Sequence, residues 1–178
     1  FIFKQALARE SKMENLGINK KTESFWRDRS VLVTGGAGFI GSNLVKKLVD
    51  LGAKVTVLDL KPSPITSDAF KKAPIFVKGD ACDLNLLKKI IKKYKISLVF
   101  HLAAQPIVEM AYSDPKTTLE NNILSTINVL ESVRLASGVD GVVVTSSDKA
   151  YGQALKLPYK ENYPLLGDHP YDVSKSSS

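Results

Sequence analysis

Three glycines after a short apolar segment constrain the fold of this chain most strongly. Gly35, Gly38 and Gly41 have the spacing G-x-x-G-x-x-G, follow the apolar run 31–33 and open an amphipathic segment at 42–50. A strand, a glycine turn and a helix in this order are typical of units that bind the phosphates of a dinucleotide. There, Gly35 permits the tight turn, Gly38 leaves the backbone open to a pyrophosphate, and Gly41 lets the helix pack closely on the strand.

The start of the predicted helix offers a site for anions. Free N–H groups and the positive end of the helix dipole lie there, so a bound pyrophosphate would meet the first turn. Phe39 and Ile40 lie in this turn and are therefore candidate cofactor-binding residues. A glycine turn also occurs without any ligand, but the flanking strand and helix favour dinucleotide binding here.

An acidic residue follows at the end of the second predicted strand. Asp59 lies 18 residues beyond Gly41. A carboxylate there accepts hydrogen bonds from the adenosine ribose hydroxyls and repels the 2′-phosphate of NADP, which predicts NAD as the cofactor. Two alternatives stay open: Asp59 caps a turn at the strand end, or the nearby Lys61 accommodates NADP.

Apolar segments of strand length alternate with helical segments along the rest of the chain. We expect further strands at 54–58, 75–78, 97–101 and 141–145, and helices at 84–94 and about 115–136. Such alternation produces a parallel sheet with helices on both faces. We therefore predict an α/β fold, a Rossmann-type doubly wound parallel sheet, over residues 30–178. The segment around Pro62 and Pro64 is predicted to be a surface loop. Residues 1–29 are predicted to form an irregular or partly helical leader, with Met13 as a candidate start.

Size and composition agree with one domain and exclude other classes of protein. With 178 residues, 44% of them hydrophobic, the chain can bury a real core. No apolar run approaches the ~20 residues of a membrane-spanning helix. The single cysteine, Cys82, excludes a disulfide framework and a multi-thiolate metal site. We expect a cytoplasmic protein with no membrane contact and no bound metal.

The net charge of +7 raises the question of a nucleic-acid partner. The densest group of lysines is interleaved with apolar residues at helical spacing: Lys88, Lys89, Lys92, Lys93 and Lys95. This spacing predicts a solvated outer helix face. No platform of stacking aromatic residues accompanies it, so we expect no nucleic-acid binding.

Several segments, taken in order, resemble the extended short-chain dehydrogenase/reductase family of nucleotide-sugar enzymes. They are Thr34–Gly41, Gly79–Asp83, His101–Gln105, Asn121–Thr126 and Tyr171-x-x-x-Lys175. Within that family, the segments 145–152 and 169–171 look most like the sugar-nucleotide 4,6-dehydratases, particularly the CDP-glucose type. In these enzymes Asp-Lys follows the catalytic Ser or Thr, as Asp148 and Lys149 follow Ser147 here.

The resemblance assigns roles along the cofactor. It implies that Asp80 and Ala81 hold the adenine end, and that Leu102, Ala103 and Ala104 line the path of the phosphates and riboses. Without the other motifs, the small residues of this path would suit a buried strand end equally well.

The resemblance also implies that Asn122 steadies the neighbouring strand and the cofactor loop. Many relatives have Gly where this chain has Ser125, a departure that is expected to tighten local packing.

Tyr171 and Lys175 are four residues apart, which places both side chains on one face of a helix. A phenol with a pKa of ~10 is a poor base at pH 7, but a neighbouring ammonium and a positive nicotinamide would stabilise its phenolate. The alternative is an amphipathic surface pair. After the glycine motif and a strand that ends in serine, the pair is a candidate for catalysis.

The resemblance implies a 4,6-dehydratase reaction. Tyr171 takes the proton of a hexose 4-hydroxyl with Ser147 hydrogen-bonded to the same oxygen, and Asp148 and Lys149 act as acid and base in the loss of water across C5–C6. Both would need shifted pKa values. The alternatives are a solvated Asp148–Lys149 ion pair, an NAD-dependent 4-epimerase, or a catalytically silent NAD-binding scaffold.

The resemblance further implies that the chain is truncated before a C-terminal substrate domain. We expect the chain as written to bind NAD weakly and to have no turnover, because a sheet edge is left uncovered. Relatives pair through two long helices, so a homodimer through the helix at about 115–136 is expected for the full-length protein.

Overall fold

The computed structural model describes residues 20–62, 74–153 and 157–178. Within them, five strands form one sheet in which every pairing is parallel. The strands are β1 (Ser30–Thr34), β2 (Lys54–Asp59), β3 (Ile75–Lys78), β4 (Leu98–His101) and β5 (Gly141–Val144). Their order across the sheet is β3-β2-β1-β4-β5. The predicted α/β Rossmann-type fold is confirmed.

The helices lie before β1, between the strands and after β5. They are α2 (Lys20–Trp26), α3 (Phe39–Asp50), α5 (Leu84–Tyr94), α6 (Val108–Ser113), α7 (Pro115–Leu119), η1 (Glu120–Leu124), α8 (Ser125–Arg134), η2 (Asp148–Tyr151) and α9 (Pro170–Ser177). The sequence pattern does not predict α6 or the 3₁₀-helix η2, because six and four residues are too few to show a helical period. Met13 and Pro64 lie outside the described residues.

A π-helix interrupts the helix predicted at about 115–136. α7, η1 and α8 follow one another directly, and η1 is π-helical. The hydroxyls of Ser125 and Thr126 both donate to the backbone carbonyl of Asn122, over 3.4 and 2.8 Å. Hydroxyls that bond to carbonyls inside a helix disturb the regular ladder. The expectation of one regular helix is therefore wrong at 120–124, a type of irregularity that often marks functional positions.

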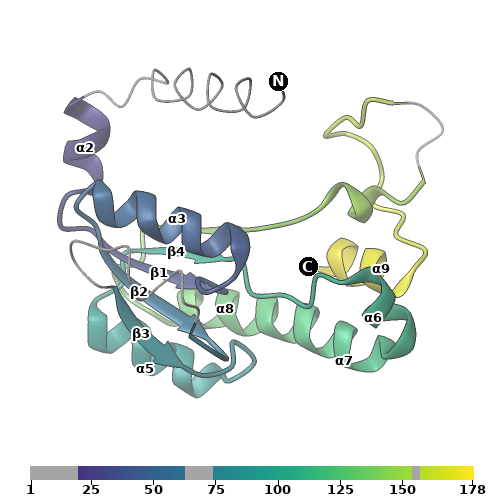
Figure 1. Cartoon of the computed structure of the whole chain (residues 1–178), viewed down its shortest axis with the longest axis horizontal. Helices are drawn as coiled ribbons and strands as arrows, with labels where there is room; N and C mark the ends of the chain where they lie inside the picture. Colours follow the sequence, from purple (N-terminus) through teal and green to yellow (C-terminus); the bar gives the residue numbers. More distant parts are fainter. Residues whose placement is uncertain (1–19, 63–73, 154–156) are drawn as a thin grey trace, which may run out of the picture.

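Two apolar clusters hold helices against the two faces of the sheet (Figure 1). On one face α3 packs on β1 and β2 through side chains such as Val33 and Val57. On the other face α5 and α8 pack through Leu87 and Val129 on Leu32. Adjacent residues of a strand point to opposite faces, so Leu32 and Val33 serve different clusters. The carboxyl ends of the strands are left for loops.

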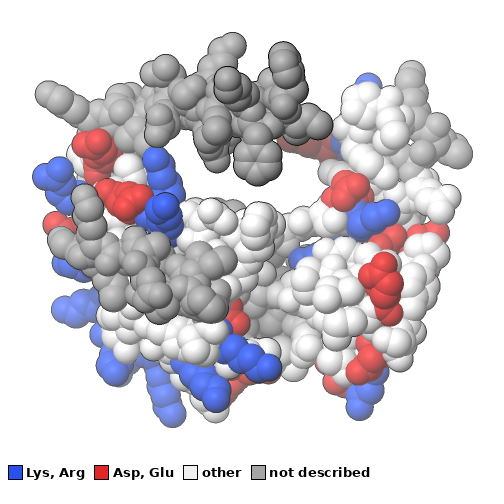
Figure 2. All heavy atoms as spheres, viewed as in Figure 1, with Lys and Arg blue, Asp and Glu red and all other residues white. Residues whose placement is uncertain are grey.

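The lysines of α5 lie on its outer side, as the spacing predicts. Lys88, Lys89, Lys92 and Lys93 are exposed while the apolar residues between them are buried. Figure 2 shows these basic side chains at the lower left, over α5. Within the described ranges, every helix is too short or too polar to cross a bilayer.

Residues before β1 also contact the folded unit. The ring of Trp26, at the end of α2, lies 6.2 Å from that of Phe100 in β4. Arg29 forms an ion pair with Asp140 over 2.8 Å. The Arg29–Asp140 pair lies at the amino ends of the strands, opposite the glycine turn, whereas Phe100 pairs with Val33 nearer their carboxyl ends. A division of the chain at residue 30 stays a prediction.

Candidate functional site

The order of the strands creates a crevice beyond β1 and β4. The chain runs from β1 outward to β2 and β3, then crosses back to β4 on the other side of β1. In doubly wound sheets, ligands bind beyond the carboxyl ends of the strands at this reversal. Thr34 and His101 are paired residues at those two ends.

The glycine turn occupies this crevice. Gly35 has a φ of +68°, a conformation that favours glycine, and its N–H donates to the carbonyl of Leu58 over 2.9 Å. A side chain at position 35 would come within 2.6 Å of the Ala103 nitrogen. Gly35 therefore allows the turn and also lets the loop after β4 pack against it.

The other two glycines differ in their surroundings. A side chain at Gly41 would collide with the carbonyl oxygen of Gly35, so at this position α3 packs tightly on the turn. A side chain at Gly38 would meet little except the Gly35 oxygen, at 3.3 Å. Gly41 is thus fixed by packing, whereas the space at Gly38 is free to admit a ligand.

The first turn of α3 carries two exposed apolar side chains. Phe39 is 82% exposed and Ile40 is 66% exposed. Apolar side chains at the mouth of a crevice suit contact with a ligand or a further segment of protein. The first N–H groups of a helix lack partners within it, so the same turn offers donors to a phosphate.

Asp59 is tied to the glycine turn. One carboxylate oxygen accepts a hydrogen bond from the N–H of Ala37 over 2.9 Å, and the other accepts from the N–H of Leu60 over 2.7 Å. The first bond holds the glycine turn, and the second is local to the end of β2. Because a carboxylate has about four lone-pair sites, Asp59 retains acceptor capacity for ribose hydroxyls.

The segment after β3 lies beside Asp59, whose carbonyl accepts from the N–H of Gly79. Asp80 is exposed and its carboxylate accepts from the N–H of Cys82 over 2.8 Å, whereas Ala81 is buried in the core. Burial, together with the Asp80 charge, raises the pKa of the Cys82 thiol to about 11.

The loop after β4 runs along the crevice. Leu102, Ala103 and Ala104 are half-buried there. The N–H of Leu102 donates to the carbonyl of Thr34 over 3.1 Å, and the N–H of Ala103 donates to the Thr34 hydroxyl over 3.3 Å. The loop is thus anchored to the end of β1.

Asn122 clamps this loop to α9. Its side-chain oxygen accepts from the N–H of Gln105 over 2.7 Å, and its amide group donates to the Gln105 carbonyl over 3.2 Å and to the Ser174 hydroxyl over 2.9 Å. Asn122 is 2% exposed, so these bonds are shielded from water. The sequence-based role included the loop but not α9.

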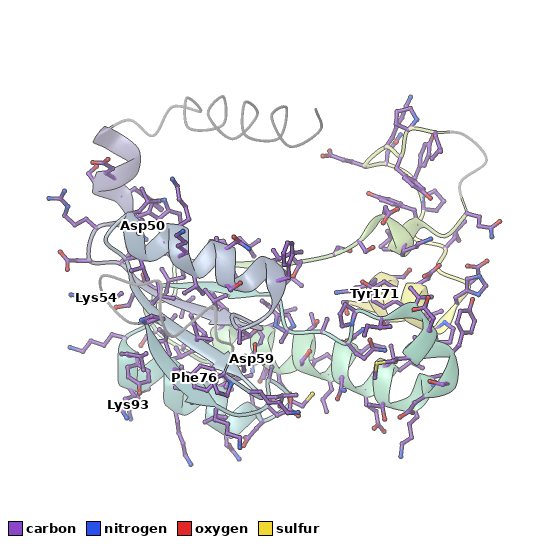
Figure 3. All side chains as sticks on the ribbon, in the orientation of Figure 1. Asp50, Lys54, Asp59, Phe76, Lys93 and Tyr171 are labelled. Carbon is purple, nitrogen blue, oxygen red and sulfur yellow. The ribbon has the colours of Figure 1, made fainter. Side chains whose placement is uncertain are left out.

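The helix α9 carries Tyr171 and Lys175 one turn apart. The ammonium of Lys175 lies 6.0 Å from the centre of the Tyr171 ring and donates to the carbonyl of Thr145 over 3.3 Å, just after β5. Burial lowers the pKa of Lys175, which is 8% exposed. Figure 3 shows Tyr171 on α9 and Asp59 at the end of β2.

The residues after β5 lie against α9. The Ser147 hydroxyl donates to the Asp148 carboxylate over 3.1 Å, and the N–H of Lys149 donates to the Ser147 oxygen over 3.2 Å. Asp148 and Lys149 are exposed. The Ser176 hydroxyl donates to the Ala150 carbonyl over 2.7 Å, which fastens η2 to α9. Ser147 and the Tyr171 helix thus belong to one packed unit.

Three buried polar residues of the site received no role from the sequence. Thr34, His101 and Ser174 are at most 2% exposed and form side-chain hydrogen bonds. Thr34 and His101 could have been noticed in the sequence because each is a polar residue at the end of an apolar strand. Ser174 lies between Tyr171 and Lys175 in the motif and carried no signal of its own.

The sheet order, the glycine turn and Asp59 define a dinucleotide-binding Rossmann domain. Comparison with known proteins identifies its kind. The family model described as GDP-mannose 4,6 dehydratase matches residues 32–178. The CDP-glucose 4,6-dehydratase of Salmonella typhimurium (strain LT2) is 35% identical over 158 residues, which cover 86% of this chain and 44% of that protein.

Two other relatives are epimerases. A putative UDP-glucose 4-epimerase of Methanocaldococcus jannaschii is 40% identical over 146 residues, 82% of this chain and 47% of the relative. The crystal structure of UDP-glucose-4-epimerase from Stenotrophomonas maltophila, with bound NAD and formylated UDP-arabinopyranose, matches with a TM-score of 0.77 and 29% identity. The match covers 83% of this chain and 46% of that one.

The chain belongs to the NAD-dependent epimerase/dehydratase family of extended short-chain dehydrogenases/reductases. NAD is the cofactor of this family. The chain spans about half the length of the curated relatives it matches. Dehydratases and epimerases both occur among them, so membership alone leaves the reaction open.

Proposed function

We propose that this chain is the NAD-binding part of a nucleotide-sugar 4,6-dehydratase. The observation that carries the proposal is the Ser147-Asp148-Lys149 segment, which follows β5 and is fastened to the helix of Tyr171 and Lys175. An acid and a base next to the serine are what a dehydratase needs beyond the parts of an epimerase. The share of the relatives' length that the chain covers supports a sugar-nucleotide domain beyond it.

The residues present fit NAD. The free space at Gly38 and the exposed first turn of α3 form a cradle for the pyrophosphate, because a side chain at 38 would partly fill it. The carboxylate of Asp59 suits the adenosine ribose, and Asp80 lies on the adjacent loop. Bound NAD supplies the hydride acceptor for C4 of the sugar and later the hydride donor for C6.

The first half of the reaction belongs to Tyr171, Ser147 and Lys175. The Tyr171 phenolate takes the proton of the sugar 4-hydroxyl as C4 is oxidised, while the Ser147 hydroxyl holds the same oxygen. The buried Lys175 ammonium favours the phenolate by its charge. The sugar becomes a 4-ketone, and the ketone acidifies the hydrogen at C5.

The second half belongs to Asp148 and Lys149. The base removes the C5 proton, the acid protonates the 6-hydroxyl, and the C6–O bond breaks so that water leaves. Hydride return to C6 and protonation of C5 give the 4-keto-6-deoxy sugar. We assign the acid to Asp148 and the base, or its partner, to Lys149. Both side chains are exposed in this chain, as groups that must reach a substrate would be.

The test uses the full-length protein with NAD and CDP-glucose. Mass spectrometry is expected to detect a 4-keto-6-deoxy product that has lost the elements of water. Asp148→Asn is expected to slow elimination more than oxidation at C4. Glu161→Gln, a change at an exposed carboxylate in the segment between η2 and α9, is the matched control and should leave both steps unchanged. Unchanged substrate across CDP-, UDP-, GDP- and dTDP-sugars would contradict the assignment.

The second candidate is a nucleotide-sugar 4-epimerase. It is favoured by the relatives in Methanocaldococcus jannaschii and Stenotrophomonas maltophila and needs only Ser147, Tyr171, Lys175 and NAD. An epimerised product of unchanged mass would identify it. Bound NAD without turnover of any sugar nucleotide would instead favour a silent scaffold.

The outer face of the helix at 115–136 supports self-association. Leu124, Ile127 and Leu130 are each more than 40% exposed there. We propose that the full-length protein is a cytoplasmic homodimer that uses this face. Sedimentation of the protein and its Ile127→Arg variant tests this, because a charge in the interface would yield monomers.

A further inference from the structure

The imidazole of His101 is buried beside the site and has no part in the proposed chemistry. His101 is 2% exposed and ends β4. Its Nδ1 lies 2.7 Å from the hydroxyl oxygen of Thr34 on β1, and its Nε2 lies 3.2 Å from the hydroxyl oxygen of Thr126 on α8. The ring therefore bridges the strand that precedes the glycine turn and the long helix.

The donors on the α8 side determine which ring nitrogen carries the hydrogen. The Thr126 hydroxyl donates its hydrogen to the carbonyl of Asn122 over 2.8 Å, so its oxygen acts as an acceptor toward Nε2. Ser125 lies 3.4 Å from both Nε2 and that carbonyl, so its single hydrogen can go to either and does not select a tautomer. Nε2 is therefore the N–H of the ring.

The direction of the hydrogen bond to Thr34 on β1 follows from the hydrogen being on Nε2. With the hydrogen on Nε2, Nδ1 is an acceptor and the Thr34 hydroxyl donates to it. The Thr34 oxygen in turn accepts from the N–H of Ala103 over 3.3 Å. The bonds therefore run in one direction, from Ala103 through Thr34, His101 and Thr126 to the Asn122 carbonyl.

The opposite tautomer, with the hydrogen on Nδ1, would leave hydrogen bonds in this series unmade. The Thr126 oxygen would face the lone pair of Nε2, and in the part of the chain that the structure describes the Thr34 hydroxyl would lose its acceptor. An unmade hydrogen bond is costly in a buried site. Burial of the ring and the nearby Lys175 ammonium lower the pKa of His101 to about 4, which keeps the imidazole neutral at pH 7.

This series of hydrogen bonds ends at residues that contact the candidate site: Ala103 at one end and Asn122 at the other. Ala103 packs against Gly35 of the glycine turn. The side chain of Asn122 bonds to the Ser174 hydroxyl, which donates to the carbonyl of Tyr171 over 2.7 Å. A shift of the ring would thus move the cofactor loop relative to the helix that carries the phenol.

We propose that His101 is a positioning residue, which as the neutral Nε2–H tautomer fixes the glycine turn relative to the Tyr171 helix. The inference rests on the proposed function where it treats Tyr171 as the catalytic phenol. Its consequences for the tautomer and for NAD affinity do not depend on which sugar reaction occurs.

The tautomer is tested by ¹⁵N NMR of the histidine-labelled full-length protein at pH 7. We expect a pyridine-type signal for Nδ1 and a pyrrole-type signal for Nε2 of His101. The chain has two histidines, so a His169→Gln variant assigns the signals. A hydrogen on Nδ1, or an imidazolium spectrum at pH 7, would overturn the proposal without any change to His101 or its bonding partners.

The positioning role is tested with a double-mutant cycle on NAD binding. Thr34→Val and Thr126→Val each break one side of the ring's bonding, and each is expected to weaken NAD binding by about two- to tenfold. Because both substitutions act through the same His101 ring, the double variant should bind NAD with an affinity only slightly lower than that of the weaker-binding single variant. Thr34→Ser and Thr126→Ser, which keep the hydroxyl, should restore affinity.

Ser132→Ala is the matched control, since Ser132 is a buried hydroxyl of α8 that bonds only within its own helix among the described contacts. It should leave NAD binding unchanged. Folded Thr→Val variants with wild-type affinity, or effects that multiply independently, would overturn the proposal. If the protein does not dehydrate a sugar nucleotide, but the ¹⁵N spectrum and the coupling of the two threonines in NAD binding are as expected, the proposed function is contradicted and the role of His101 is supported.

Discussion

The carboxylate of Asp59 accepts a hydrogen bond from the backbone N–H of Ala37 over 2.9 Å, which ties the end of β2 to the glycine turn. The residue assigned to the adenosine ribose therefore also shapes the loop proposed to hold the pyrophosphate. Its other oxygen accepts from the N–H of Leu60. A change at position 59 should affect the loop and the choice of cofactor together.

Asp59→Asn should weaken NAD binding and reduce the preference for NAD over NADP. The amide has one acceptor oxygen for two backbone N–H groups, and it lacks the charge that repels a 2′-phosphate. Loss of a hydrogen bond to a charged group costs about 1.5–3 kcal/mol, which corresponds to about tenfold or more in affinity. Calorimetric titration with each cofactor measures this. Asp50→Asn, at an exposed carboxylate near the end of α3 (Figure 3), should change neither affinity.

Gly41→Ala and Gly38→Ala should separate folding from cofactor binding. The first places a methyl group against the Gly35 carbonyl and should lower the free energy of unfolding by about 1–3 kcal/mol or more. The second brings its methyl group within 3.3 Å of the Gly35 oxygen only and has ordinary backbone angles, so it should cost much less stability than the first but weaken NAD binding. Denaturant unfolding and NAD titration distinguish the two. Wild-type NAD affinity in Gly38→Ala would argue against the phosphate cradle.

Lys175→Met should abolish most activity of the full-length protein without unfolding it. Methionine fills similar buried space but lacks the ammonium that favours the Tyr171 phenolate, so kcat is expected to fall by about 10²–10⁴-fold. Because burial lowers the pKa of Lys175, the buried charge is unfavourable there and the melting temperature should not drop. Lys116→Met, at a side chain that is 81% exposed, is the control. Activity close to wild type would contradict the assigned role.

Acid should destabilise the folded chain through His101. Its pKa is about 4 when folded and 6.5 ordinarily, so the unfolded chain binds more protons between these values. The stability contributed by the neutral ring is complete above pH 6.5 and is lost as the pH falls through about 4. At about 1.4 kcal/mol per pKa unit this amounts to roughly 3 kcal/mol. Urea unfolding from pH 7 to pH 4 should show a shallower loss of stability for His101→Gln, and parallel curves would contradict the prediction.

Cys82 should react slowly with thiol reagents in the folded protein. Its pKa of about 11 leaves little thiolate at pH 8, and the thiolate is the reactive form. Asp80→Asn removes a negative charge that raises this pKa, so the reaction should become faster. The protein unfolded in guanidinium gives the reference rate. Equal rates for the folded and unfolded chains would show that the thiol is not held in the protonated form.

The alternation of strands and helices was predictable because its signals are local. The apolar run 31–33, the glycines that follow it and the period of α5 each lie within a dozen residues. A parallel sheet with helices on both faces follows from that pattern through general packing rules. The predicted strand boundaries lie within one residue of those observed.

The hydrogen-bond partners of the buried polar groups could not be predicted from the sequence. Thr34 and His101 are 67 residues apart in the chain, and Asn122 and Ser174 are 52 apart, yet each pair shares a hydrogen bond. The π-helix η1 likewise lies where the hydroxyls of Ser125, Thr126 and Ser178 share the Asn122 carbonyl.

The sequence by itself determined the α/β class, the glycine turn and the identity of the residues that could do chemistry, because local pattern and side-chain type suffice for these. Only the tertiary structure decided which buried group each polar atom meets, how Asp59 shapes the turn and which hydroxyls lie beside the two ring nitrogens of His101. The physical reason is that hydrogen bonding acts over about 3 Å in space, and no periodicity in the chain reports which distant atoms folding brings that close.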